Sequence, residues 1–330
     1  MSTPLTINSV EALQEALPII RASQEAYGTF TQEQVDAICE KTAMAVSKMR
    51  IPLAKMACEE TGYGIVVDKV TKNQYASEHV WNYMRNKKTC GVISEDKAFG
   101  VKKVASPKGV IAAITPTTNP TSTTIYKIML ALKTRNAIIL SPHPHAVNCS
   151  IAAAKIMRDA AIEAGLPEHV ISWISVPSLE ISDVLMKSVD LIMATGGSGM
   201  VKAAYSSGTP AIGVGPGNCN VVIDETADLR MAVESIIHSK TFDNGMICAS
   251  EQHITVLASV YDEVKRLLKE ARCYFLNDDE AAKVADVFFN AKTHGVKPAA
   301  VGQTACRLAE MAGIEVPYDT KVLIYETNDT

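Results

Sequence analysis

The sequence has neither an excess of one charge nor a long apolar run. Lysine and arginine number 32 against 36 aspartates and glutamates, which gives a formal net charge of −4. Such a balance does not supply the basic surface by which proteins bind nucleic acid or anionic membranes. Apolar runs such as Gly109 to Ile114 are far shorter than the roughly 18 residues of a membrane span. We therefore expect no nucleic-acid partner and no membrane partner.

The sequence also lacks paired cysteines and a leader-like N-terminus. Its eight cysteines are scattered without CxxC spacing, and a chain of 330 residues buries enough core to fold without disulfides. The first residues, MSTPLTINSVEALQEALPII, contain no basic segment followed by an apolar stretch and a cleavage site. We expect a cytoplasmic protein whose cysteines are reduced thiols, most of them filling the core.

The N-terminal part of the chain shows helical periodicity. Apolar side chains recur every three or four positions over residues 9–86, and Thr31 followed by Gln34 is typical of a capping box that opens a helix continuing to Met49. Residues 87–108 change to short β-prone pieces broken by glycine and proline, which predicts a hairpin.

From residue 109 the pattern alternates between apolar runs of strand length and helical segments. The expected strands are Gly109 to Thr115, Ala137 to Leu140, Val170 to Ile174 and Val189 to Ala194. The expected helices are Thr121 to Lys133, Ala146 to Ala164, Leu179 to Lys187 and Met200 to Ser207. This alternation is typical of an α/β fold with a Rossmann-type, doubly wound parallel sheet. Ligands of such sheets bind beyond the carboxyl ends of the strands.

After Pro210 the order of the elements changes, and we expect a second α/β domain to begin near residue 243. The elements expected after Pro210 are strand Val221 to Ile223, helix Leu229 to Ser239, strand His253 to Leu257 and helix Tyr261 to Ala271. A loop with glycine and cysteine, residues 243–250, interrupts them. We place the boundary at this loop, with a first domain over residues 1–242 and a second over residues 243–330.

Two of the loops after expected strands have alternative interpretations. Asn119 either holds a substrate oxygen or, with Thr121, only caps the next helix. The turn Thr195-Gly-Gly-Ser-Gly199 either offers backbone amides to a phosphate or is a tight turn without a ligand. It fits neither the GxGxxG nor the Walker pattern. A third segment, GVGPGN at residues 213–218, favours close packing of the backbone.

Two further segments carry histidine or cysteine. Ser141-Pro-His-Pro-His145 with Cys149 is a metal site, a cofactor-facing loop or an ordinary loop; the missing fourth ligand and the prolines argue against metal, and we expect none. Cys248 lies in the glycine-containing loop at the expected domain boundary. A thiol is a strong nucleophile where nearby amides stabilise its thiolate, but a single cysteine is more often a packing residue.

Taken together and in this order, the loops resemble those of the aldehyde dehydrogenase superfamily. The resemblance is closer to its CoA-acylating branch, the acetylating acetaldehyde dehydrogenases and the N-terminal half of the bifunctional aldehyde-alcohol dehydrogenases. The similar stretches are PTTNPTSTTIYK, ALKTRNAIILSPHPHA, ATGGSGMVKAAYSSGTPAIGVGPGN and SKTFDNGMICASEQ. The similarity extends over essentially the whole chain, including the helical N-terminal part.

The resemblance implies roles for individual residues. Cys248 is expected to be the nucleophile, and Asn119 together with the backbone amide of Cys248 is expected to bind the oxyanion. The residues expected to bind the cofactor NAD are Thr117, Ser141, Pro142, His143, Thr195, Gly196, Gly197, Ser198, Gly213 and Gly215. The implied fermentative reaction converts an aldehyde, coenzyme A and NAD to acyl-CoA and NADH through a cysteine thioester, with acetaldehyde as the default substrate.

The resemblance also predicts how the thioester is resolved. Hydrolytic relatives carry a glutamate in the segment aligned with Ile212-Gly213-Val214, where it activates water. This chain has Gly213 there, with space where the glutamate would stand, so transfer to the thiol of CoA is the expected route. A Gly213→Glu change is accordingly expected to favour hydrolysis if the new side chain reaches the thioester.

Related acylating domains are longer than this chain. The resemblance therefore implies a truncated catalytic domain, little dehydrogenase activity in these 330 residues alone, and a homo-oligomer in the full-length form with residues 87–108 as its arm. Two rival hypotheses remain open from the sequence. One is a noncatalytic fragment that keeps the fold for assembly or nucleotide binding, and the other is a cysteine acyltransferase that needs no nicotinamide.

Overall fold

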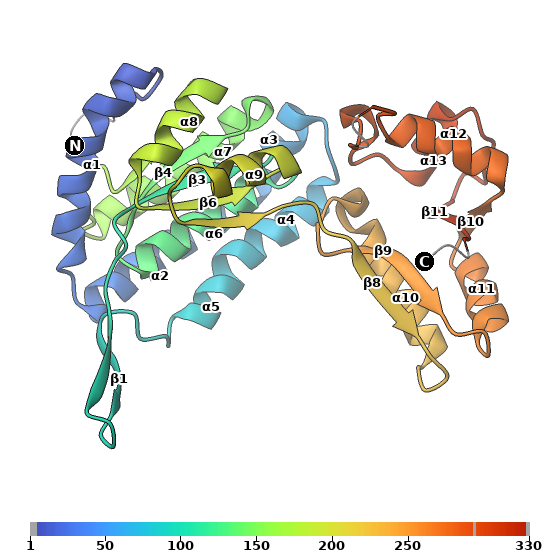
Figure 1. The fold of residues 1–330 in the computed structure, drawn as a ribbon, viewed down its shortest axis with the longest axis horizontal. Helices are drawn as coiled ribbons and strands as arrows, with labels where there is room; N and C mark the ends of the chain where they lie inside the picture. Colours follow the sequence, from blue (N-terminus) through green and yellow to red (C-terminus); the bar gives the residue numbers. More distant parts are fainter. Residues whose placement is uncertain (1–4, 293–294, 328–330) are drawn as a thin grey trace. The chain divides into compact units, whose positions relative to one another are not determined.

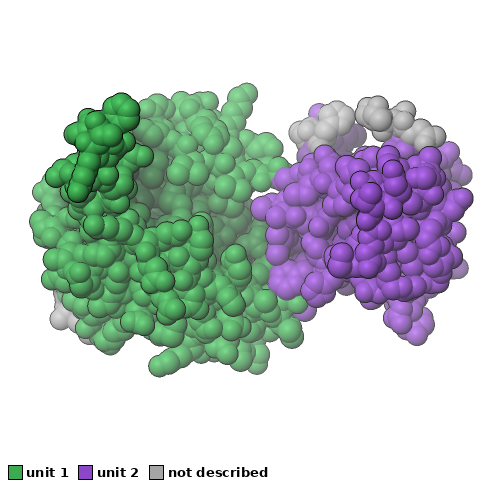
Figure 2. All heavy atoms as spheres, turned by 90° about the horizontal axis from the view of Figure 1, so that it is seen from below, with its two compact units in different colours: residues 1–62, 66–216 green, residues 63–65, 217–330 purple. Residues whose placement is uncertain are grey.

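The computed structural model describes residues 5–292 and 295–327. The chain forms two compact units (Figure 2): residues 1–62 and 66–216 belong to unit 1, and residues 63–65 and 217–330 belong to unit 2. The second unit therefore begins earlier in the chain than the boundary expected at residue 243. The physical reason is that the first strand and helix after residue 217 share a core with later elements, not with the sheet of unit 1.

Unit 1 is built on a parallel sheet with β3 at its centre (Figure 1). In spatial order the strands are β5 (Ile171–Trp173), β4 (Ala137–Pro142), β3 (Val110–Thr115), β6 (Leu191–Thr195) and β7 (Ala211–Val214). Every neighbouring pair is parallel, so the expected doubly wound α/β fold is confirmed. The direction of winding reverses between β3 and β6, which is where ligands bind in sheets of this class.

Helices cover both faces of this sheet. The helices and helical turns of the unit are α1 (Val10–Gly28), α2 (Gln32–Lys48), α3 (Arg50–Thr61), α4 (Val66–Gln74), the π-helical turn η1 (Tyr75–His79), α5 (Val80–Met84), α6 (Pro120–Lys133), the 3-10 turn η2 (Pro144–Ala146), α7 (Val147–Glu163), α8 (Leu179–Ser188) and α9 (Ser198–Ser206). Right-handed connections place α6 and α7 on one face and α8 and α9 on the other. Within the described ranges, no helix is long and apolar enough to cross a bilayer.

The helical N-terminal part predicted over residues 9–86 is confirmed. Its α1 packs on α8 and the sheet, and its α2 packs on α6 and α7. The predicted capping box at the start of α2 is also present: Thr31 Oγ1 accepts from the amide of Gln34, and the Gln34 side chain accepts from the amide of Thr31 at 2.9 Å. These reciprocal bonds satisfy two amides that the helix leaves unpaired.

The predicted hairpin is likewise confirmed. Its strands β1 (Gly91–Asp96) and β2 (Val101–Ala105) pair antiparallel, and their side chains are almost all exposed. Exposed apolar residues include Val92, Val104 and Phe99, and Phe99 is 82% exposed. A two-stranded hairpin without a covered apolar face is only marginally stable by itself in water.

Strand β7 was not expected from the sequence. Its four residues, Ala211–Val214, alternate between partial burial and exposure and include a glycine, so they lack the continuous apolar run of the inner strands. The strand forms because its backbone pairs with β6 at the edge of the sheet, with Gly213 opposite Ala194.

Lys127 on α6 joins the two strands between which the winding reverses. Its Nζ donates to the carbonyl oxygens of Ile114 on β3 at 2.6 Å and Met193 on β6 at 2.7 Å. The residue is buried, and burial lowers the pKa of its amine to about 7. These two bonds hold the carboxyl ends of β3 and β6 together directly below the loops that follow them.

Unit 2 contains two pairs of parallel strands with helices between them. Its elements are β8 (Cys219–Ile223), α10 (Leu229–Thr241), the 3-10 turn η3 (Phe242–Gly245), β9 (Glu251–Val256), α11 (Tyr261–Glu270), β10 (Cys273–Leu276), α12 (Asp278–Phe288), the 3-10 turn η4 (Pro298–Ala300), α13 (Ala305–Met311) and β11 (Val322–Tyr325). Strand β8 pairs with β9, and β10 pairs with β11. A core that includes Ile223, Val233, Val264 and Cys273 ties α10 and α11 to these strands, so the expected second α/β domain is present.

Replacement of Thr31 by alanine should loosen the start of α2. Loss of an N-cap of this kind costs about 1 kcal/mol, so amide hydrogen exchange in peptides covering the first turn of α2 should speed up about fivefold. Thr71→Ala is the matched control, because Thr71 sits in the exposed interior of α4 and its hydroxyl only donates to the Val67 carbonyl. Equal exchange rates in wild type and Thr31→Ala would contradict the stabilising role of the cap.

Candidate active site

The loops at the carboxyl ends of β3 and β6 start from neighbouring strands. Residues 116–119 follow β3, and Gly196 and Gly197 follow β6. Because the two strands are parallel and in register from Ile111 opposite Leu191 to Ile114 opposite Ala194, both loops leave the sheet at the same edge. The predicted oxyanion residue and the predicted phosphate-binding turn therefore lie at one edge of unit 1.

Asn119 does not cap helix α6 with its side chain. It occupies the N-cap position, but its side chain makes no capping bond, so the capping interpretation of this residue is wrong. Its Oδ1 instead accepts from Lys72 Nζ on α4 at 2.7 Å, and its Nδ2 donates to Thr118 Oγ1 at 3.2 Å. The amide thus contacts Lys72 and Thr118 and does not cap its own helix.

Helix α4 holds the backbone on both sides of Asn119. Lys69 Nζ donates to the Thr118 carbonyl oxygen at 3.0 Å, and Thr121 Oγ1 donates to Asn73 Oδ1 at 2.8 Å. Lys69, Lys72 and Asn73 are all buried, at 2%, 9% and 0% exposure. The sequence did not reveal these residues, because lysines on a short polar helix ordinarily lie on its solvated face.

The glycine turn after β6 presents exposed backbone at the start of a helix. Gly197 is the N-cap of α9 and, having no side chain, offers no capping group to the first amides of the helix. Gly197, Ser198 and Gly199 are exposed, and Thr195 and Gly196 are half-buried. Exposed amides at a helix N-terminus attract phosphate groups, so the turn is suited to a pyrophosphate.

The space expected beside Gly213 is filled. A Cβ built on Gly213 would lie 2.7 Å from the ring of Tyr205 and 2.8 Å from the Val201 side chain. The Tyr205 hydroxyl accepts from the Gly213 amide at 2.9 Å, which fastens α9 to the outer edge of β7. The expectation that a glutamate would find room here is therefore wrong, since both contacts would have to yield. Gly215 is less crowded, with Val201 at 3.8 Å.

The other predicted cofactor residues differ in exposure. Thr117 is half-buried in the loop after β3, whereas His143 is exposed after β4. Ser141 and Pro142 are buried, and the Ser141 hydroxyl lies 3.3 Å from that of Ser182 on α8.

The His143 and His145 rings lie edge to face with their centroids 5.4 Å apart. Cys149 is buried, and its thiol donates to the Ala146 carbonyl oxygen. Over residues 5–292 and 295–327, no group of three or more histidine, cysteine, aspartate or glutamate side chains is placed to hold a metal ion.

The cysteine loop in unit 2 is shaped by three consecutive left-handed residues. Asp243, Asn244 and Gly245 have φ angles of 50°, 54° and 70°, values that aspartate, asparagine and glycine tolerate better than other residues. The buried Asp243 carboxylate accepts from the Ile65 amide at 2.7 Å, and Asn244 Nδ2 donates to the Gly302 carbonyl oxygen at 2.8 Å. The sequence Asp-Asn-Gly therefore determines the backbone conformation of the loop segment that leads to Cys248.

Cys248 differs from the other seven cysteines in being exposed. Cys39, Cys90, Cys149 and Cys273 are buried, and burial raises the pKa of the Cys39 and Cys273 thiols to about 12. A thiol with such a pKa is protonated, and hence a poor nucleophile, at neutral pH. Of the eight free cysteines, Cys248 is the exposed one.

Gly217 lies directly against the cysteine loop. A Cβ on Gly217 would lie 2.2 Å from the Cys248 carbonyl oxygen, so only glycine fits at this approach. The thiol of Cys219, at the start of β8, also donates to that oxygen at 3.8 Å. The close backbone packing expected of residues 213–218 is confirmed at Gly217.

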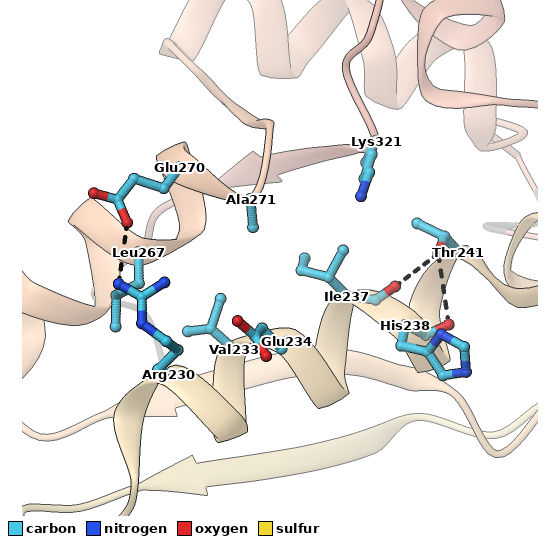
Figure 3. A pocket seen from close by; sticks show the side chains of 10 residues that line it. All are labelled: Arg230, Val233, Glu234, Ile237, His238, Thr241, Leu267, Glu270, Ala271 and Lys321. Carbon is cyan, nitrogen blue, oxygen red and sulfur yellow. Dashed lines mark hydrogen bonds and ion pairs between the residues drawn. The ribbon is translucent and has the colours of Figure 1, made fainter.

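A separate cavity of about 310 Å³ lies in unit 2 between α10 and α11 (Figure 3). Its lining residues are Arg230, Val233, Glu234, Ile237, His238, Thr241, Leu267, Glu270, Ala271 and Lys321. Arg230 and Glu270 form an ion pair of 3.5 Å at its rim. None of the predicted site residues lines this cavity, so it is distinct from the candidate active-site residues.

Comparison with known proteins identifies relatives of both units. The chain matches the model of the aldehyde dehydrogenase family over residues 6–285. It is 52% identical over 324 residues to the bifunctional aldehyde-alcohol dehydrogenase of Escherichia coli K12, covering 98% of this chain. The chain spans 36% of the length of that relative and 37% of the length of the aldehyde-alcohol dehydrogenase of Clostridium acetobutylicum.

Solved structures agree with these matches. An acetylating aldehyde dehydrogenase from Geobacillus thermoglucosidasius superposes with a TM-score of 0.92 at 45% identity, covering 97% of this chain and 71% of that one. A propionaldehyde dehydrogenase from Rhodopseudomonas palustris, solved with bound propionyl-CoA, superposes with a TM-score of 0.83 at 30% identity, covering 98% of this chain and 72% of that one. The chain belongs to the aldehyde dehydrogenase family, in its CoA-acylating branch.

Proposed function

We propose that this chain carries the nucleotide-binding and cysteine elements of an enzyme that converts an aldehyde, CoA and NAD to acyl-CoA and NADH. The observation that carries the proposal is the exposed Cys248, held on a loop whose shape depends on Asp243, Asn244 and Gly217. Membership in the CoA-acylating branch supports the reaction class. Acetaldehyde is the proposed substrate, because the Geobacillus relative is named as acetylating.

In the proposed mechanism the Cys248 thiolate adds to the aldehyde carbonyl carbon. The negative charge that develops on the oxygen is stabilised by Asn119 Nδ2 and by the backbone amide of Cys248. Expulsion of hydride from the tetrahedral adduct leaves an acyl thioester on Cys248. Attack by the thiol of CoA on that thioester then releases acyl-CoA and regenerates the cysteine.

NAD would supply the acceptor for the hydride. The residues of unit 1 that fit it are those of the glycine turn, because the exposed backbone of Gly197, Ser198 and Gly199 opens α9 and can take a pyrophosphate. Thr117, Ser141, Pro142, His143, Thr195, Gly196, Gly213 and Gly215 are the further residues that we propose for the nucleotide site. Of these, Ser141 would act through the shape of β4, since its hydroxyl is buried against Ser182.

Gly213 and Tyr205 support CoA as the acyl acceptor. Residue 213 has no side chain to serve as a base, and the ring and hydroxyl of Tyr205 occupy its surroundings. A water molecule would therefore lack a general base from this position. A thiol needs less assistance, because it ionises near neutral pH and is intrinsically more nucleophilic.

Assembly and compartment are part of the same proposal. The exposed β1–β2 hairpin with Val92, Phe99 and Val104 suits an arm that is covered by another subunit of a homo-oligomer. The eight free thiols suit a reducing compartment, for which we propose the cytoplasm.

Cys248→Ala should remove aldehyde-dependent NADH formation by at least about a thousandfold, because the covalent step has no other nucleophile in the proposal. The assay uses this chain and a version extended with the remaining residues of its E. coli relative. Mass spectrometry after trapping with aldehyde and NAD should find the acyl group on the peptide with Cys248. Cys219→Ala is the matched control and should retain the adduct; an acyl group on Cys219 or Cys149 would contradict the assignment.

Gly213→Glu alone should not create a hydrolytic enzyme. Its side chain collides with Tyr205 and Val201, so we expect a loss of about 1–3 kcal/mol in the free energy of unfolding and no gain in NADH turnover without CoA. The double change Gly213→Glu with Tyr205→Ala opens the space and should raise the ratio of turnover without CoA to turnover with CoA. Tyr205→Ala alone serves as the control. A single Gly213→Glu variant as stable as wild type and active without CoA would refute this view of the site.

A further inference from the structure

The thiol of Cys219 lies next to the residue that we propose as the nucleophile. Its Sγ donates a weak hydrogen bond of 3.8 Å to the carbonyl oxygen of Cys248. That oxygen and the Cys248 thiol belong to one residue, so the two cysteines are neighbours although 29 positions separate them in the chain. Both cysteines belong to unit 2, and their contact therefore lies within one compact unit.

The backbone around the two cysteines is equally close. A Cβ built on Gly217 would lie 2.2 Å from the Cys248 carbonyl oxygen and 3.9 Å from the Cys248 Cβ. Strand β8, which begins at Cys219, pairs in parallel with β9, which follows the cysteine loop. Cys248 itself is the second residue of a β-turn that the Ser250 amide closes onto the Ile247 carbonyl oxygen at 3.0 Å. Strand pairing and this turn hold the two segments side by side.

Both thiols reach the surface of the unit. Cys248 is exposed and Cys219 is half-buried. The thiolate is the form of cysteine that reacts with peroxides, and accessible thiols form it more readily than thiols buried in apolar surroundings. Cys306 of the same unit is also half-buried, but its thiol faces the carbonyl oxygens of Tyr318 and Thr320. Cys306 therefore provides a matched control for Cys219.

We propose that Cys219 is a resolving cysteine, which forms a reversible disulfide with Cys248 after a peroxide has oxidised the nucleophile. The proposal rests on the function proposed above, because it concerns the regulation of the same site. A disulfide occupies the sulfur that would add to the aldehyde, so the oxidised enzyme is inactive. Reduction of the disulfide restores the thiol.

The oxidation takes two steps. In the first, the Cys248 thiolate attacks one oxygen of hydrogen peroxide and the O–O bond breaks, which leaves a sulfenic acid. The departing hydroxide takes up the proton lost by the Cys248 thiol and becomes water. In the second, the Cys219 thiolate attacks the Cys248 sulfur, the S–O bond breaks, and hydroxide leaves with the proton of the Cys219 thiol. Two thiols and one peroxide thus give one disulfide and two water molecules.

Formation of the disulfide needs a local movement. Its two sulfurs must come within about 2.05 Å of each other. Cys248 lies between η3 and β9, outside any helix or strand, and its side chain can rotate among staggered positions. The movement therefore falls on the turn that carries Cys248, while Cys219 stays in its strand.

A resolving cysteine also protects the nucleophile. Without a thiol nearby, a second peroxide converts the sulfenic acid to a sulfinic acid, which thiols do not reduce. The disulfide stops this sequence, because dithiothreitol returns two electrons to it by thiol exchange and releases both cysteines. Loss of Cys219 should therefore make the oxidation of Cys248 irreversible.

The first test locates the disulfide in the 330-residue chain. The chain is treated with hydrogen peroxide, its remaining thiols are alkylated, and its peptides are identified by mass spectrometry. In wild type and in Cys306→Ser, the peptides with Cys219 and Cys248 should be joined, and dithiothreitol should separate them. A gel without reductant should show the joined species as a single chain. In Cys219→Ser, the peptide with Cys248 should instead carry the additional oxygens of sulfinic and sulfonic acid.

The second test measures NADH formation in the chain extended with the remaining residues of its E. coli relative. Before oxidation, Cys219→Ser should be within about twofold of wild type, because the proposed reaction does not use its thiol. After peroxide, its removal, and treatment with dithiothreitol, wild type and Cys306→Ser should recover to within about twofold of their starting rates. Cys219→Ser should recover less than about a tenth of its rate.

Three results would overturn the role of Cys219. They are a wild-type Cys248 that is oxidised without being joined to Cys219, a disulfide that joins two chains, and equal recovery of wild type and Cys219→Ser. An extended wild-type enzyme that forms no NADH before oxidation would instead overturn the proposed function. The joined peptides would still decide whether Cys219 is the disulfide partner of Cys248.

Discussion

The two hydrogen bonds of Lys127 hold the part of the sheet on which the candidate site depends. By donating to the Ile114 and Met193 carbonyl oxygens, this side chain ties β3 to β6 at the point where the winding reverses. The loop with Asn119 and the glycine turn start within a few residues of these two carbonyls. A neutral amine still has two hydrogens to donate, which matches the two carbonyls, so the tie persists when the proton is lost. Between about pH 7 and 10.5 the unfolded chain binds a proton here that the folded chain does not, so this group makes stability rise with pH over that range.

The inner strands and the cysteine loop were predictable from the sequence because local physics decides them. Runs such as Val110–Thr115 and Ala137–Pro142 are buried on both faces, and their continuous apolar character shows this directly. Asp243, Asn244 and Gly245 occupy left-handed backbone that these residue types tolerate. In both cases the residues needed for the structure are adjacent in the chain, so a short window of sequence contains the whole signal.

The parts that escaped prediction depend on contacts between distant segments. Strand β7 exists through pairing with β6, and its own four residues carry no clear pattern. Lys72 lies far in sequence from Asn119, and a lysine on a polar helix carries no mark of burial. The same reason explains two of the interpretations that the structure corrects, a capping role for Asn119 and open space beside Gly213. The contacts of Lys72 with Asn119 and of Tyr205 with Gly213 are not apparent from the residues that adjoin Asn119 and Gly213 in the sequence.

The route of the chain through unit 2 has a consequence for dividing the protein. Residues 63–65 belong to this unit although they precede most of unit 1 in the sequence. The Ile65 amide is a hydrogen-bond donor to the buried Asp243 carboxylate, and Gly64 packs directly on that side chain. A gene fragment that begins at residue 217 would encode the cysteine loop without residue 65. The buried Asp243 carboxylate would then lose the hydrogen bond from the Ile65 amide. Any version of unit 2 made by itself needs residues 63–65 supplied separately or joined by a circular permutation, since the spatial unit is not one continuous stretch of the gene.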